Sequence, residues 1–275
     1  MTPGAIAALG ALAGLTIFLG LPIGRIRRRS LGLSALLNAV TIGVLLFLLW
    51  DVITHAIEPI DAAVASSTHD AVSLWKAVGF TAVFFVAIAI GLLSLVAYDR
   101  SMKKRAALEP HASGTPRSPL RLHEQASRTA FLIAVGIGLH NFSEGLAIGQ
   151  SAVSGQISLA VVLVVGFGLH NATEGFGITA PLAGDQVRPS WTQLAILGVI
   201  GGGPTVVGTL LGSVFVSDIV SLAFLALAAG SIIYVIIQLI GVAMKLARGT
   251  ALHVGLLAGL FAGFVTDFIV TAAGV

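Results

Sequence analysis

Apolar residues run along this chain in long blocks, and short polar stretches separate one block from the next. Each block is close to the roughly 20 residues that an α-helix needs to cross the hydrocarbon core of a bilayer. The pattern predicts an all-α membrane protein with eight transmembrane helices, organised as one transmembrane domain over residues 1–275. The expected spans are 4–24, 33–57, 77–98, 129–151, 157–181, 191–215, 219–243 and 251–273.

Composition supports this class of protein. Hydrophobic residues make up 56% of the chain and charged residues 10%, whereas a soluble domain carries about 25% charged residues. The 33 glycines favour close packing between helices, and small-residue faces of this kind allow a homodimer without requiring one. Because the chain has no cysteine, the sequence excludes a disulfide framework, a thiolate metal site and a cysteine nucleophile.

The basic residues predict how the spans are oriented. Fourteen of the fifteen lysines and arginines fall in four loops on one side, and only Lys76 falls elsewhere. Because basic loops stay in the cytoplasm, we expect a multi-pass protein of the cell membrane with both termini outside, extracellular or periplasmic. The net charge of +3 is then a topological signal, and the expected partner is the lipid bilayer and not nucleic acid. The fourteen are Arg25, Arg27, Arg28, Arg29, Arg100, Lys103, Lys104, Arg105, Arg117, Arg121, Arg128, Arg188, Lys245 and Arg248.

The longest of these loops, residues 99–128, contains three prolines and scattered charge, which is typical of a flexible cytoplasmic segment. His111 and His123 within it can collect a metal ion weakly on the cytoplasmic side, but solvated loop histidines are the more common interpretation of such a pattern.

Two copies of one polar motif interrupt the fourth and fifth spans. LHNFSEG occupies residues 139–145 and LHNATEG residues 169–175. In each copy the histidine and the glutamate are four residues apart, so both lie on one face of a helix. Because a short loop joins the two spans, they should run antiparallel as neighbours, and the motifs should meet near the membrane midplane. The residues brought together there are His140, Glu144, His170 and Glu174.

Two imidazoles and two carboxylates suit a borderline divalent cation such as zinc. A charge at the centre of a membrane helix costs about 2.5–3.5 kcal/mol on insertion scales, so two glutamates at that depth require a cation or protons between them. The histidines favour a metal over a proton relay. Asn141 and Asn171 leave two hypotheses open: they supply a second, oxygen-rich metal position, or their amides only hydrogen-bond across the helices.

At these residues the sequence resembles the ZIP (Zrt-, Irt-like protein) family of divalent metal transporters, prokaryotic type. HNFSEGLAIG matches the family signature HNxPEGxAxG with Ser143 in place of proline, and LHNATEG matches the next span with Thr173 in that place. We expect both hydroxyls to bond to the preceding turn instead. The resemblance implies eight spans, the four-residue metal site described above, and a moving bundle of spans one, four, five and six.

The chain also departs from the family pattern. Two-metal members have a glutamate before a proline in span six, where this chain has Gly203, and Gln238 occupies an acidic position of span seven. We therefore expect one dominant metal site. We assign Gln238, together with the two loop histidines, to a weak exit path. No cofactor is expected beyond the transported ion.

Other polar residues lie within or beside the spans. Asp51, His55 and Glu58 follow an i, i+4, i+7 pattern on one face at the end of span two, and form either an entrance path that gathers cations or an ordinary wetted helix end. Asp267 stands alone in span eight, and we assign it to a hydrogen bond with a neighbouring hydroxyl and not to transport. Pro204 is expected to kink span six.

The sequence thus predicts a transporter that moves zinc, or iron, manganese, cadmium or cobalt, into the cytoplasm by alternating access, without enzymatic activity. Two alternatives remain open. An intramembrane metalloenzyme is disfavoured because the motif has asparagine, and not the glutamate of HExxH, beside each histidine. A non-transporting membrane metal sensor would use the loop 99–128 as its output.

Overall fold

The computed structural model describes residues 1–26, 31–67, 71–108, 120, 122, 124–184, 187–214, 217–246 and 249–272. These residues form helices and short connections, with no strand among them. Within them, eight segments are long and apolar enough to cross a membrane, which confirms the predicted number of spans. In chain order the elements are α1 (Pro3–Leu15), α2 (Ile17–Gly20), the 3₁₀ helix η1 (Leu21–Arg25), α3 (Leu31–Ser67), α4 (Ala71–Leu108), α5 (Gln125–Val153), α6 (Ile157–Gly184), α7 (Trp191–Gly212), α8 (Asp218–Leu246) and α9 (Gly249–Ala272).

Two helices extend well beyond the predicted spans. α3 continues to Ser67 and α4 to Leu108, about ten residues past the expected ends. Residues 99–108, expected to belong to a flexible loop, are therefore helical, because hydrophobicity marks the part of a helix that lies in the bilayer and not its end. His111 and His123 lie outside the described residues.

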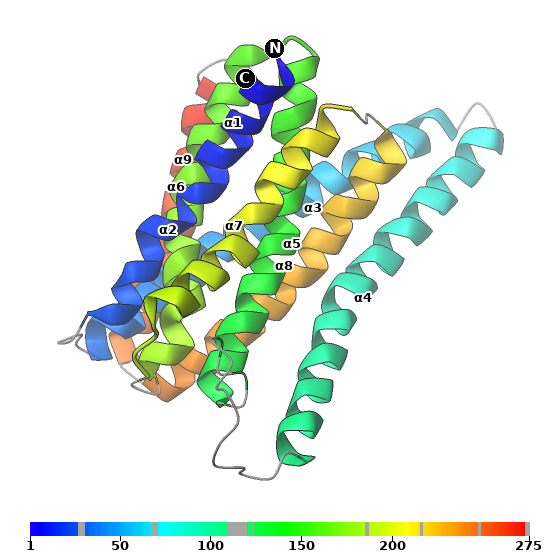
Figure 1. The fold of residues 1–275 in the computed structure, drawn as a ribbon. Coiled ribbons are helices and arrows are strands. Elements are labelled where there is room, and N and C mark those ends of the chain that lie inside the picture. Colours follow the sequence, from blue (N-terminus) through cyan, green and yellow to red (C-terminus); the bar gives the residue numbers. More distant parts are fainter. Residues whose placement is uncertain are drawn as a thin grey trace.

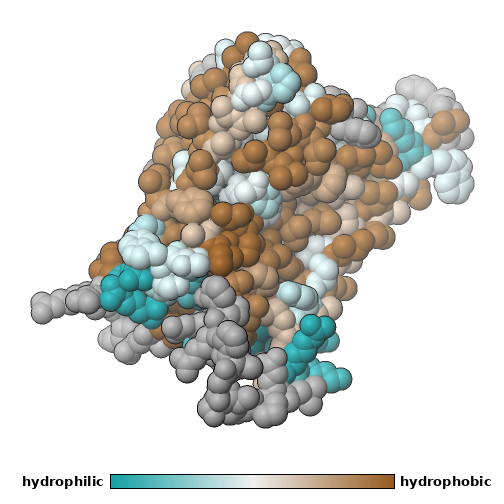
Figure 2. Space-filling view, viewed as in Figure 1, coloured by the Kyte–Doolittle hydropathy of each residue, from teal (hydrophilic) through white to brown (hydrophobic). Residues whose placement is uncertain are grey.

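The start of α1 and the end of α9 lie at the same end of the molecule (Figure 1). We call this end the terminal side, and the opposite end, where α4 ends and α5 begins, the loop side. Hydrophobic residues cover most of the helix flanks in view, and hydrophilic residues gather toward the ends (Figure 2). Such a surface suits a bilayer around the flanks and water at both ends.

The helices pack as two bundles. The first bundle contains α1, α2, η1, α5, α6 and α7, and the second contains α3, α4, α8 and α9. Glycine allows the closest approach within the first bundle: a Cβ atom on Gly145 would lie 2.2 Å from the carbonyl oxygen of Thr205, and one on Gly208 would lie 2.1 Å from that of Phe142. Only residues without a side chain permit such backbone contact between α5 and α7.

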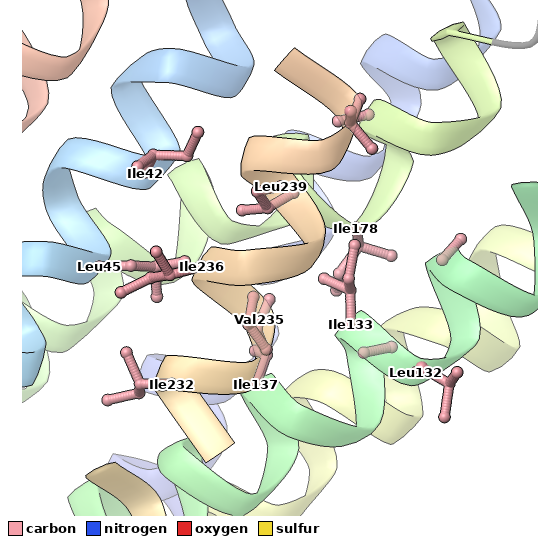
Figure 3. Close-up of a cluster of buried hydrophobic side chains, with 14 of the residues drawn as sticks. Ile42, Leu45, Leu132, Ile133, Ile137, Ile178, Ile232, Val235, Ile236 and Leu239 are labelled. Carbon is pink, nitrogen blue, oxygen red and sulfur yellow. The ribbon is translucent and has the colours of Figure 1, made fainter. Parts of the chain in front are cut away.

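The bundles meet along a seam where α5 faces α8 and α6 faces α3. On the loop side, branched aliphatic side chains fill this seam (Figure 3). On the terminal side it opens into a cavity of about 640 Å³. We call the filled part the apolar seam. Its labelled residues include Ile42, Leu45, Ile133, Ile137, Ile178, Ile232, Val235, Ile236 and Leu239.

Candidate metal site

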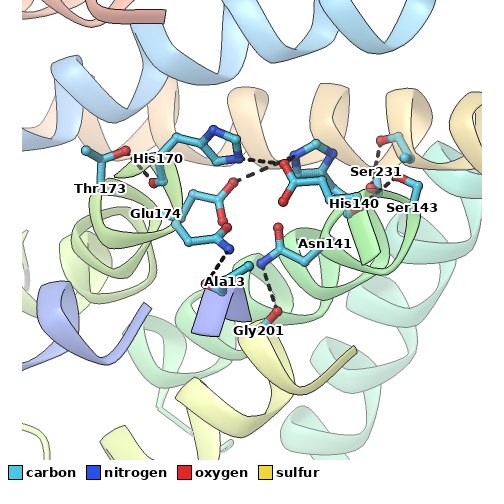
Figure 4. A network of polar contacts seen from close by, with 12 residues as sticks. Ala13, His140, Asn141, Ser143, His170, Thr173, Glu174, Gly201 and Ser231 are labelled. Carbon is cyan, nitrogen blue, oxygen red and sulfur yellow. Dashed lines mark hydrogen bonds and ion pairs between the residues drawn. The ribbon is translucent and has the colours of Figure 1, made fainter. Parts of the chain in front are cut away.

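The two motifs lie near the middle of α5 and α6, which are neighbours joined by a short connection. His140 and Glu144 come from α5, and His170 and Glu174 from α6. Their side chains converge between the two helices (Figure 4). The antiparallel pairing expected from the sequence therefore brings all four together at one depth.

Glu144 stands between the two histidines. Its Oε1 atom lies 2.9 Å from Nε2 of His140 and 2.5 Å from Nε2 of His170. Glu174 approaches from the other helix, with its Oε1 atom 4.0 Å from Nε2 of His140. Ligand atoms of His140, His170 and Glu174 all lie within 4.8 Å of one another. Because tetrahedral zinc, with ligands at about 2.0–2.2 Å, holds them about 3.3–3.6 Å apart, shifts of about 1 Å would let these atoms enclose an ion.

The four residues differ in their access to water. His140 and Glu174 are 1% and 0% exposed, whereas the side chain of His170 is 12% exposed. The cavity on the terminal side is lined by His140, Glu144 and His170, and Glu174 is not part of its described lining. An ion arriving through the cavity would therefore meet the histidines and Glu144 before it reached Glu174.

Several polar atoms of the cluster are buried without a hydrogen-bond partner among the described residues. Leaving one such group unsatisfied costs about 1–3 kcal/mol, and more for a charged group. Native structures satisfy nearly all their buried polar atoms, so a concentration of unsatisfied atoms at one place, most of them oxygen acceptors, suits a cationic ligand. The atoms without a hydrogen bond are Nδ1 of His140, Oε2 of Glu144, both carboxylate oxygens of Glu174, and Oδ1 of Asn141 and Asn171; Nε2 of His140 also makes none of good geometry, although it keeps its ion-pair contact with Glu144.

Each asparagine uses one end of its amide to hold a neighbouring helix. Nδ2 of Asn141 donates to the carbonyl oxygen of Gly201 in α7 at 3.0 Å, and Nδ2 of Asn171 donates to that of Ala13 in α1 at 3.1 Å. Their Oδ1 atoms remain buried and without a partner in the described part of the chain. The geometry therefore supports both hypotheses for these residues, because bonding across the helices leaves the oxygens available as ligands.

The hydroxyls that replace the family's prolines bond to the preceding turn, as predicted. Oγ of Ser143 donates to the carbonyl oxygen of His140 at 2.7 Å, and Oγ1 of Thr173 donates to that of His170 at 2.7 Å. Both helices stay continuous through the motifs. The two copies thus share a local backbone arrangement as well as a sequence.

Asp51, His55 and Glu58 all line the cavity, as do His140, Glu144 and His170 of the histidine–glutamate cluster. Nδ1 of His55 lies 3.5 Å from a carboxylate oxygen of Asp51. Asp267 and Asp218 line the same cavity, and the charge of Asp267 acts on both Asp51 and His55.

Asp267 lines this cavity and does not stand apart from the other polar residues, and its exclusion from transport stays a prediction. No hydroxyl partner for it is found among the described residues. The sequence did contain a signal for a role of Asp267 in transport, because an ionisable residue inside a span is typical of a transport path.

Gly203 does not face the cluster. A Cβ atom there would meet only Val199 of its own helix, at 3.7 Å, and α7 is one helix through Pro204. A Cβ atom at this position therefore contacts no residue of the cluster, and the expected single dominant site stays a prediction. Gln238 is half-buried in α8 and outside the described lining of the cavity, and its exit role stays a prediction.

A helical membrane protein with a buried histidine–glutamate cluster in one of two bundles, beside the seam between them, has an architecture that suits a metal transporter. The profile of the ZIP zinc transporter family matches residues 99–266, which is more than half of the chain. The chain belongs to this family, and is thus a transporter of divalent metal ions and not an enzyme. A comparison with curated proteins found no match.

Proposed function

We propose that the chain carries zinc, or a related divalent cation, into the cytoplasm by binding it among His140, Glu144, His170 and Glu174. The unsatisfied buried atoms of this cluster carry the proposal. A cation held among them would offset the cost of burying two carboxylates and would satisfy acceptors that have no other partner. Imidazole and carboxylate ligands favour zinc, and also accept iron, manganese, cobalt and cadmium.

The cavity provides the route to this cluster. Carboxylates in a cleft with low-dielectric walls raise the local concentration of cations, and Asp51, Glu58 and Asp267 line the cleft here. His55 beside Asp51 adds a ligand on which an ion can exchange part of its water before it moves on. This stretch is accordingly the entrance path, and the alternative of a merely wetted helix end is the less favoured one.

Release on the other side requires the apolar seam to part. Rigid movement of one bundle against the other would do this, because the cluster belongs wholly to the first bundle and the seam runs between the two. With the terminal side outside, as the basic loops predict, the ion enters from outside. A membrane potential of 100 mV, negative inside, then favours entry of a divalent ion by about 4.6 kcal/mol.

The test is uptake of radioactive Zn²⁺ into proteoliposomes that contain the full chain. His140→Ala and Glu144→Ala should reduce uptake to the level of protein-free liposomes. Asp51→Asn should raise the half-saturating concentration about threefold with little change in maximal rate, because it weakens cation gathering and leaves the cluster intact.

The matched control is His253→Ala, a histidine on the exposed face of α9 that is hydrogen-bonded within its own helix. It should transport at the parent rate. Saturable uptake that survives both His140→Ala and Glu144→Ala would refute the site, and a parent protein without saturable uptake would favour a metal sensor.

A further inference from the structure

Arg128 is a basic residue that the topological pattern places in a water-exposed loop, yet it is only 8% exposed. The other described lysines and arginines are exposed or half-buried. Burying a guanidinium is costly unless an opposite charge compensates for it. Its surroundings therefore indicate what it does.

The partner comes from the other bundle. Nε of Arg128, at the start of α5, lies 3.7 Å from Oδ1 of Asp99 on α4, and their side chains are 9% and 13% exposed. Beside the pair, the rings of Tyr98 on α4 and Phe131 on α5 lie 6.3 Å apart. Tyr234 of α8 contributes a buried hydroxyl on which both charges act. An ion pair and an aromatic contact thus join α4 to α5 at the same level.

These contacts lie at the loop-side end of the seam, beyond the apolar seam residues and opposite the cavity. α4 packs mainly on α8 and α3 and touches α5 very little, so this end is where the long α4 joins the two bundles directly. When the cavity is open on the terminal side, the loop side is closed, and this ion pair spans the closed end.

We propose that the Asp99–Arg128 pair, with Tyr98 and Phe131 beside it, is a latch that holds the loop side shut while the cluster is open to the terminal side. The proposal rests on the alternating access proposed above. In the latched state the pair is shielded from water, so its attraction is strong. Once the bundles shift, water reaches both charges and compensates for the lost contact, so the latch can open reversibly.

The absence of cysteine from the chain makes thiol labelling a clean test. Val235→Cys places a reporter in the apolar seam, at a residue 1% exposed, and Ala147→Cys places one in the cavity lining. Each is introduced alone into the full chain, and the rate of reaction with a polar maleimide is measured in detergent. Asp99→Asn and, independently, Arg128→Gln should raise the ratio of seam to cavity labelling about five- to tenfold.

Two variants separate a latch from general loosening. Lys103→Gln removes a second described partner of Asp99, a lysine on the same helix whose Nζ lies 2.5 Å from Oδ2 of Asp99. The ratio should stay unchanged, because that bond does not join the bundles. The exchanged pair Asp99→Arg/Arg128→Asp should return the ratio toward the parent value.

An unchanged ratio in both single variants, or equal increases at both reporters, would overturn the latch. Equilibrium binding of Zn²⁺ is measured in parallel. If the parent protein does not bind Zn²⁺, that result counts against the proposed function alone. The labelling ratio reports the latch whether or not the cluster binds metal.

Discussion

The helix contacts inside each bundle differ in kind from those across the seam. In the second bundle a Cβ atom on Gly91 would lie 2.1 Å from the carbonyl oxygen of Leu227, and in the first one on Gly208 would lie 2.1 Å from that of Phe142. Across the seam, the nearest atom to a Cβ on Gly136 is a methyl group of Val235, at 2.5 Å. At these glycines the closest contact inside a bundle is with backbone, whereas the closest contact across the seam is with a side chain.

This difference bears on movement. Two helices whose backbones touch at glycine have one close-packed arrangement, because any rotation brings a side chain into a carbonyl group. Aliphatic side chains can change rotamer and slide, which is how packed elements shear past each other. The bundles are therefore the rigid parts, and the seam is where the molecule can yield.

The largest expected effect on Zn²⁺ uptake comes from a disulfide that links the two bundles across the seam. A Cβ atom on Gly177 of α6 would lie 3.7 Å from Cβ of Thr41 in α3, close to the mean spacing of about 3.8 Å in disulfides. Oxidised Gly177→Cys/Thr41→Cys should lose Zn²⁺ uptake by about tenfold or more and regain it on reduction.

The control for this crosslink is Gly24→Cys/Thr179→Cys, within the first bundle. A Cβ atom on Gly24 would lie 3.0 Å from Cβ of Thr179. Its oxidation should leave uptake close to that of the reduced form. Full uptake by the oxidised seam pair, with the disulfide verified by mass spectrometry, would contradict movement between the bundles.

A smaller effect distinguishes the two kinds of glycine. Gly208→Ala drives a methyl group against a backbone carbonyl that cannot move aside, and we expect a loss of about 3 kcal/mol in stability. Gly136→Ala meets only the Val235 side chain and should cost about 1 kcal/mol. Thermal unfolding in detergent measures both, and equal losses would remove the contrast between bundle and seam.

The smallest expected effect concerns Gly203 of α7, where a Cβ atom would meet only Val199 of its own helix. Gly203→Glu should leave the number of bound Zn²⁺ ions unchanged, because a Cβ atom at this position contacts no residue of the cluster. Gly203→Ala is the matched control for the helix itself. Equilibrium dialysis provides the measurement, and one additional bound ion in the glutamate variant would show that α7 rotates toward the cluster.

Much of this arrangement follows from the sequence. Apolar runs predict the eight spans, and the repeated motif predicts that two histidines and two glutamates meet at one depth. The bonds of Ser143 and Thr173 to the preceding turn were also expected, because a hydroxyl at that position has few other acceptors in an apolar helix. These features depend on spacing along one helix or on the pairing of neighbours.

What the sequence misses is the direction in which a side chain points relative to a third helix. Glu144 lies between both histidines while Glu174 lies outside the cavity lining, although the motifs are nearly identical. Asp267 has no periodic partner that would reveal its face, and an aligned position does not say where Gly203 points. Arg128 is counted as a loop charge although the fold buries it.

The hydrogen bond from Asn171 to Ala13, next to the histidine–glutamate cluster, has a consequence for comparing sequences. The first span is interrupted after α1, and the carbonyl oxygen of Ala13 accepts from Oγ1 of Thr16 at 2.6 Å as well as from Asn171. Any amino acid at position 13 offers that same carbonyl. The bond to Asn171 therefore does not depend on the side chain at position 13, so paired substitutions between the two positions would not reveal this contact.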